Sequence, residues 1–189
     1  MTINATTSGP RNPPACPLVL TLGMDDDSFG RLDGWRNEYF PPERNLVPAH
    51  LTLFHHLPGS QLREVHAEVD RLAATTPAIL LRFSDPFRLS GGFALRVEAP
   101  ALVTLRAALA RSFDAWLTPQ DRQPYRRPHV TLMNKADRDV AAVAFDHFRA
   151  RFERFDGSGE SIRLWAYEGG PWRALGVTPL QQTPHDPPT

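Results

Sequence analysis

Two short stretches of the sequence, HLTL at residues 50–53 and HVTL at residues 129–132, share the pattern His, apolar, Thr, apolar. In a β-strand, side chains two positions apart leave the same face of the sheet, so His50 points with Thr52 and His129 points with Thr131. The apolar residues between them point to the opposite face, toward the core. The composition of the chain yields well under one such stretch by chance, so the two copies indicate a site.

Two imidazoles and two hydroxyls around one small volume suit the chemistry of a phosphate diester. Cleavage needs one group that takes a proton from the attacking oxygen and another that gives a proton to the leaving oxygen. Histidine titrates near neutral pH, so a pair can hold opposite protonation states. The threonine hydroxyls can donate hydrogen bonds to the non-bridging phosphate oxygens. This chemistry requires neither a metal nor another cofactor, and which histidine is the acid stays open.

Other residues are candidates for binding the substrate. If both strands stay regular, the face of each motif continues to His56 and to Lys135, six residues beyond its histidine, while His55 points to the opposite face. Arg127, just before the second motif, could contact a phosphate. The aromatic side chains of Phe93 and Tyr125 could stack on a nucleobase.

The neighbouring histidines of the first motif raise the alternative of a zinc site. His50, His55 and His56 lie close in sequence, but adjacent residues of a strand face opposite ways and no acidic or cysteine ligand follows at a familiar spacing. Cys16 is the only cysteine, which excludes an intramolecular disulfide. The sequence therefore predicts no metal site.

The elements around the two motifs follow the same order. Hydrophobic spacing and breaker residues predict a strand, a helix, a proline-containing loop, a strand that carries the motif, a second helix and further strands, and then repeat this order. The predicted strands are residues 17–23, 49–57, 78–90, 92–99, 129–135, 161–168 and 172–177, and the predicted helices are 25–40, 60–72, 100–116 and 140–152. The motif histidines lie 79 residues apart, which indicates a diverged duplication.

A duplication of this kind predicts an α+β fold with two antiparallel sheets that face each other across a central cleft, and with the helices outside. We expect one domain of two pseudo-symmetric lobes over residues 16–180. Residues 1–15 and 181–189 are expected to form a flexible lead and a flexible tail, because both are polar and rich in proline.

Composition limits the function classes. The chain has 21 basic and 21 acidic residues in 189, so binding of duplex nucleic acid through a broad basic surface is not predicted. No apolar run approaches the length of a membrane span, and the start of the chain lacks the apolar core of a signal peptide. A cytoplasmic monomer is the expectation.

The two motifs are similar to the paired H-x-T-x motifs of the 2H phosphoesterase superfamily, in particular its bacterial 2'-5' RNA ligase-like and cyclic phosphodiesterase-like proteins. The similarity extends over residues 16–178. It implies a bilobal fold with a central groove and metal-independent chemistry on 2',3'-cyclic phosphates of RNA ends or small nucleotides. Some relatives run the reverse direction and join RNA ends through a 2'-5' linkage without ATP.

By the same resemblance, His50 and His129 form the acid/base pair, and the hydroxyls of Thr52 and Thr131 hold the phosphate. The sequence departs from many relatives after the second motif, where MNK stands in place of a nearby arginine. The neutral net charge supports an alternative, an RNA- or nucleotide-binding module with little or no turnover.

Overall fold

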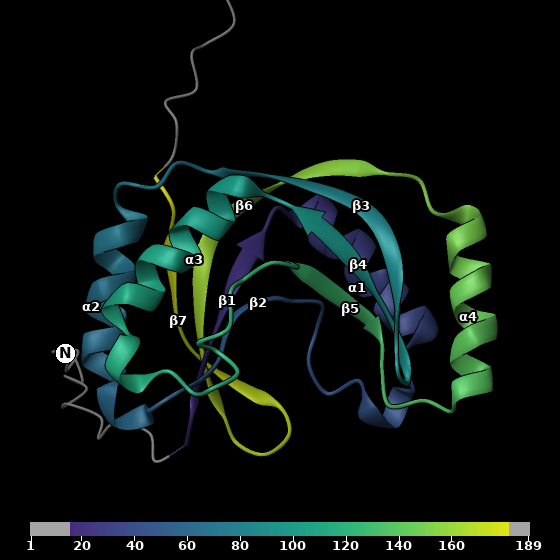
Figure 1. Cartoon of the computed structure of the whole chain (residues 1–189), viewed down its shortest axis with the longest axis horizontal. Helices are drawn as coiled ribbons and strands as arrows, with labels where there is room; N and C mark the ends of the chain where they lie inside the picture. The colour runs from purple at the N-terminus through teal and green to yellow at the C-terminus, as the bar shows by residue number, and fades with distance from the viewer. Residues whose placement is uncertain (1–15, 182–189) are drawn as a thin grey trace, which may run out of the picture.

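The structure, a computed structural model, describes residues 16–181 and contains seven strands and four α-helices in that range (Figure 1). The element order is β1 (Leu18–Met24), α1 (Asp26–Tyr39), β2 (Leu51–Leu57), α2 (Leu62–Ala73), β3 (Ile79–Leu89), β4 (Gly92–Glu98), α3 (Pro100–Ser112), β5 (His129–Met133), α4 (Arg138–Arg151), β6 (Phe155–Tyr167) and β7 (Trp172–Pro179). Strand, helix, strand, helix, strand therefore occurs twice, from β1 to β3 and from β4 to β6. The predicted repetition of elements is confirmed.

The helices begin where local chemistry favours a start. The carboxylate of Asp25 accepts a hydrogen bond from the backbone N–H of Ser28 at 2.8 Å and so caps α1. Asp137 caps α4 in the same way, and Pro100 is the first residue of α3, where a missing N–H costs nothing. The third helix ends at Ser112, four residues before its predicted end.

The strands form one closed antiparallel ring instead of the two separate facing sheets predicted from the sequence. The order β1-β2-β5-β4-β3-β6 returns to β1, and β7 lies outside this ring on β6. Closure depends on the 13-residue strand β6, which pairs with β3 over residues 155–159 and with β1 over residues 159–166. Figure 1 shows α2 and α3 together on one side of the strands and α4 on the other, so the helices lie outside the sheet as predicted.

The first part of β6 is the segment that the sequence prediction missed. Residues 155–160 read FDGSGE, a composition that disfavours strands. The glycines are required by close approach: a Cβ on Gly157 would overlap Ser28 Oγ, and one on Gly159 would overlap Leu22 Cδ2. Small residues here let β6 pass against the start of α1 and against β1.

The apolar residues of both motifs are part of the core. Leu51, Leu53, Val130 and Leu132 are each at most 1% exposed. The strands β2 and β5 meet at one register pair, Leu51 opposite Val130, which are the middle residues of the two H-x-T triplets. This pairing fixes the position of the motifs relative to each other.

The predicted flexible termini, residues 1–15 and 181–189, lie outside the described residues apart from Gln181. Within residues 16–181, no helix is long and apolar enough to cross a membrane.

Candidate active site

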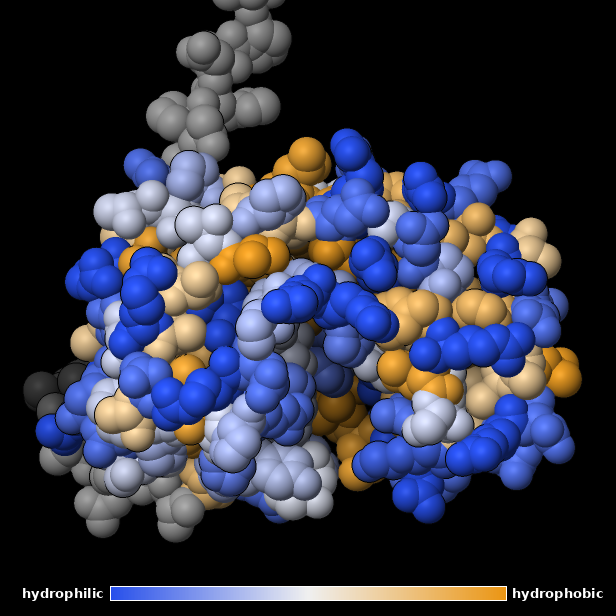
Figure 2. Space-filling view, in the orientation of Figure 1, coloured by the Kyte–Doolittle hydropathy of each residue, from blue (hydrophilic) through white to orange (hydrophobic). Residues whose placement is uncertain are grey.

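The two motifs line one cavity. Because β2 and β5 are antiparallel and Leu51 faces Val130 in the register, His50 is the neighbour of Thr131 and Thr52 is the neighbour of His129. A cavity of about 160 Å³ is lined by His50, Thr52, His55, Tyr125, His129, Thr131 and Trp172. This face of the molecule is hollowed near its centre, between the two halves (Figure 2). The structure thus brings together the four residues predicted to be catalytic.

Both motif histidines are held by the same local hydrogen bond. His50 Nδ1 lies 2.8 Å from the carbonyl oxygen of Pro48, and His129 Nδ1 lies 2.8 Å from the carbonyl oxygen of Arg127. A carbonyl oxygen only accepts, so Nδ1 of each ring carries the hydrogen. Each Nε2 is then left for proton transfer. The two histidines therefore share the same tautomer and the same hydrogen bond to a carbonyl two residues earlier.

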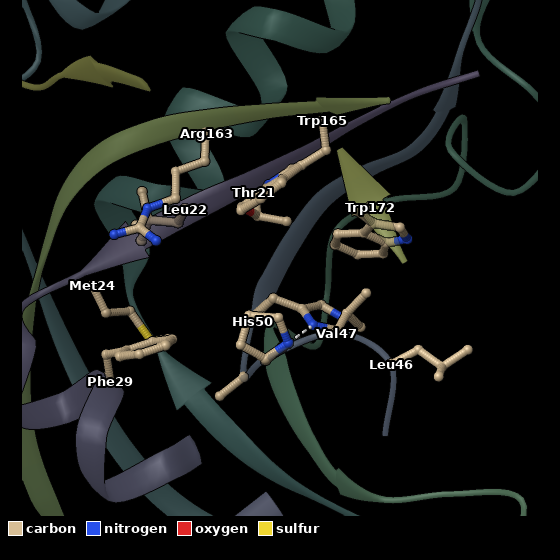
Figure 3. Close-up of a pocket in the computed structure, with 13 residues that line it drawn as sticks. Thr21, Leu22, Met24, Phe29, Leu46, Val47, His50, Arg163, Trp165 and Trp172 are labelled. Atoms are coloured by element: carbon tan, nitrogen blue, oxygen red, sulfur yellow. Dashed lines mark hydrogen bonds between the residues drawn. The ribbon is translucent and has the colours of Figure 1, made fainter. Parts of the chain in front are cut away.

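The surroundings of the two imidazoles differ. The ring of His50 lies 4.7 Å from that of Trp172, centroid to centroid, and Figure 3 shows this indole beside His50. Burial lowers the pKa of His50 to about 4, although the hydrogen bond to Pro48 opposes the shift, and the positive charge of Arg36 lowers the pKa further. His50 is therefore neutral at pH 7. His129 has Phe87 against its ring edge at 5.6 Å.

His55 faces the cavity, whereas the sequence prediction placed it on the opposite face. In the register of β1 with β2, Thr21 lies opposite Thr52, but Leu20 lies opposite Phe54. The extra residue in β2 is a β-bulge, and it reverses the alternation of side chains beyond Thr52. A second irregularity follows before Leu57.

The bulge also decides where Phe54 and His56 lie. Phe54 is 0% exposed and packs on Phe113 at 5.4 Å. His56 is exposed and is not among the residues that line the cavity, so the structure does not place it as a substrate ligand. His55, and not His56, is therefore the histidine beyond the first motif that lines the cavity.

Among the aromatic candidates, Tyr125 lines the cavity and Phe93 does not. The hydroxyl of Tyr125 donates a hydrogen bond to the carbonyl oxygen of Thr52 at 2.7 Å, and burial raises the pKa of this hydroxyl. Phe93 is 0% exposed and packs against Tyr39 and Phe148, because β4 turns this residue toward the helices. The prediction that Phe93 stacks on a base is wrong.

Lys135 does not lie on the predicted strand face, and Arg127 lies just before the second motif. β5 ends at Met133, and Lys135 has a left-handed backbone with φ 61°. Its side chain lines a second cavity, of about 290 Å³, that includes His50, Thr131, Arg36 and Arg44. The guanidinium of Arg127 lies over the ring of Phe87 at 5.7 Å, and Arg127 contributes its carbonyl to His129.

A smaller pocket of about 50 Å³ is also lined by His50. Figure 3 shows Arg163 and Trp165 of β6 across from His50, with Met24 and Phe29 at one end. The indole N–H of Trp165 donates to Thr21 Oγ1 at 2.9 Å. Trp165 and Arg163 were not predicted to belong to the site, because only the closure of the sheet by β6 brings them there.

Among residues 16–181, no group of three or more His, Cys, Asp or Glu side chains is arranged to hold a metal ion. The metal-independent chemistry stays a prediction.

The fold is shared with several solved structures, all below 25% identity. A phosphoesterase crystal structure matches with a TM-score of 0.61 and 18% identity, over 89% of this chain and 100% of that one. E. coli LigT, crystallised with 3'-AMP, matches with a TM-score of 0.58 and 21% identity, over 88% of this chain and 99% of that one. The protein TT0787 of Thermus thermophilus gives a TM-score of 0.59 and 19% identity, over 87% of this chain and 97% of that one.

None of the curated proteins matches the chain in sequence. The sequence profile of the 2'-5' RNA ligase superfamily matches residues 24–171, which include both motifs and every strand from β2 to β6. That match spans well over half of the chain, and the fold agrees with it. The protein therefore belongs to the 2'-5' RNA ligase superfamily of 2H phosphoesterases.

Proposed function

We propose that the protein opens 2',3'-cyclic phosphate esters at RNA ends or on small nucleotides by metal-independent acid/base catalysis. One observation carries the proposal: two histidines with equivalent Nδ1 anchors, each next to the threonine of the other motif, line a single cavity of about 160 Å³. The crystallisation of the similarly folded E. coli LigT with 3'-AMP, a ribonucleotide, supports this choice of substrate class.

In the proposed reaction His50 acts as the general base, because its imidazole is neutral at pH 7. Nε2 of His50 takes a proton from water, whose oxygen forms a bond to phosphorus. The bond between phosphorus and one ribose oxygen breaks, and that oxygen takes a proton from Nε2 of His129. The base gains one proton and the acid loses one, so exchange with solvent restores both.

The threonines support the charge that develops on phosphorus. Thr52 and Thr131 can donate their hydroxyl hydrogens to the non-bridging oxygens, one from each strand. The ring of Tyr125 forms part of the cavity wall, and Lys135 with Arg44 supplies positive charge in the adjoining cavity for a further phosphate of the substrate. In the ligase direction the 5'-hydroxyl of a second strand replaces water, and the same groups act.

The test is turnover of an oligonucleotide that ends in a 2',3'-cyclic phosphate, followed by ³¹P NMR in excess chelator. We expect the wild type to give a phosphate monoester, and His50→Ala and His129→Ala to lower kcat by roughly 10²- to 10⁴-fold. The control is His66→Ala, an exposed histidine on α2. Equal turnover by the wild type and both motif variants would contradict the proposal.

The second candidate is a nucleotide-binding module with little turnover. It is favoured by the lack of lysine and arginine among the residues lining the 160 Å³ cavity. It predicts nucleotide affinity that depends on Thr52 and Thr131 while the ³¹P signal of the cyclic phosphate stays unchanged.

A further inference from the structure

A third imidazole lies in the cavity, and neither the motifs nor the comparisons assign it a role. His55 lines the cavity together with both motif histidines, and its side chain is 51% exposed. We propose that His55, held by Asp121, is a phosphate-binding residue that presents Nε2–H to a non-bridging oxygen of the substrate. This inference rests on the proposed function, since it names a ligand of the same phosphate.

Asp121 fixes the ring of His55. The side chain of Asp121 is 2% exposed, and its carboxylate lies 3.1 Å from Nδ1 of His55. The same carboxylate accepts the backbone N–H groups of His55, at 3.0 and 3.1 Å, and of His56, at 2.9 Å. The backbone bonds tie the carboxylate to the bulged strand, so the imidazole contact is made from a fixed position.

The protonation of the pair follows from these contacts. Burial raises the pKa of Asp121, but the hydrogen bonds from His55 and from the two backbone N–H groups lower it, and the net shift is downward. An ionised carboxylate only accepts, so Nδ1 of His55 carries a hydrogen. His50 and His129 donate Nδ1–H to neutral carbonyls, whereas His55 donates Nδ1–H to a carboxylate, which leaves Nε2 of His55 as the ring nitrogen for the substrate.

The negative charge of Asp121 is also balanced by a buried arginine, Arg106. Arg106 is 5% exposed, donates to the backbone carbonyl of Asp121 and lies close enough for the carboxylate to raise its pKa, although burial lowers the pKa more. The same guanidinium donates to the carbonyl of Leu53 at 3.1 Å. Arg106, Asp121 and His55 thus form a hydrogen-bonded chain whose imidazole end lines the cavity.

The phosphate of the substrate needs a hydrogen-bond donor of this kind in the cavity. A cyclic phosphate carries one negative charge, and attack by water places more on the non-bridging oxygens. None of the seven residues that line the cavity is lysine or arginine, and His50 is neutral. His129 must give its proton away in the reaction, so His55 is the lining imidazole left to donate a hydrogen bond to the non-bridging oxygens throughout.

The experiment compares His55→Gln and His55→Lys with the wild type on the cyclic-phosphate oligonucleotide. Glutamine keeps polarity without charge, so kcat/KM should fall by about 10- to 100-fold, the range for a hydrogen bond to a charged group. Lysine restores a positive charge and should recover part of the loss. His66→Gln is the matched control, because His66 forms the same type of pair with Asp70 at 3.0 Å on exposed α2 and should stay within twofold of wild type.

A binding measurement makes the result independent of turnover. Titration of the wild type with inorganic phosphate, followed by ¹H–¹⁵N NMR of the imidazoles, should shift the Nε2 signal of His55 and leave that of His66 in place. An unchanged His55 signal, or a kcat/KM of His55→Gln within twofold of wild type, overturns the inference and leaves the proposed function standing. If the wild type gives no product, the proposed function fails and the phosphate titration alone decides the role of His55.

Discussion

The orientation of each motif histidine is set within three residues of chain. In both strands the carbonyl of the residue two positions earlier, Pro48 or Arg127, lies beside Nδ1 of the histidine. Tautomer and ring direction are therefore local properties, and they are the same in both halves. The low pKa of His50 comes from distant residues, chiefly from those that bury its ring.

The acid limb of the pH–rate profile should report His50. The base is active when neutral, so kcat/KM of the wild type should stay level as pH falls through 6.5 and drop near pH 4. Trp172→Ala exposes the ring of His50 to water and should move this limb toward the ordinary value of 6.5. The measurement is turnover from pH 3.5 to 8, and a wild-type limb near 6.5 would contradict the assignment of His50 as base.

At the scale of elements, the bulge in β2 decides which side chains reach the cavity. Asp121 stabilises this bulge from the loop before β5, since one carboxylate accepts the N–H groups of two successive strand residues. Tyr125 joins the same loop to β2 through the carbonyl of Thr52. The loop is thus a structural brace for the strand as well as a wall of the site.

Asp121→Ala should lower the free energy of unfolding by roughly 2–4 kcal/mol, because it leaves two backbone N–H groups of the strand without acceptors. Urea denaturation measures this change. Asp70→Ala is the control, since its partner His66 and its own carboxylate are both about half exposed, and the cost should stay below about 1 kcal/mol. Equal costs for the two variants would show that Asp121 does not brace the strand.

At the scale of the whole molecule, the closed ring holds the two halves at a fixed distance. β2 and β5 share one register pair, whereas β6 joins β1 to β3 along most of its length, so β6 supplies most of the pairing that closes the ring. β6 also positions Trp165, and its partner β7 positions Trp172, which buries His50. Folding thus couples to the ionisation of His50, the proposed general base.

Stability should therefore depend on pH in a window set by His50. Its pKa is about 4 in the folded chain and about 6.5 when unfolded, so the unfolded state binds more protons between these values. The free energy of unfolding should fall as pH decreases from 6.5 to 4, by at most about 1.4 kcal/mol per pH unit. Urea titrations across this range measure it. His50→Gln should flatten the pH dependence of the free energy of unfolding. An unchanged slope in this variant would contradict the assignment of the dependence to His50.

The sequence by itself determined the repeated order of elements and the pairing of each histidine with its threonine, because helical spacing, strand alternation and capping act over a few residues. It also determined that Leu51 and Val130 belong to the core. The bulge that brings in His55 depends on the register with β1, and the burial of His50 depends on Trp172, more than a hundred residues away. The closure of the ring depends on a strand rich in Gly and polar residues, whose pairing comes from its neighbours. These features require contacts between distant segments, and only the tertiary structure decided them.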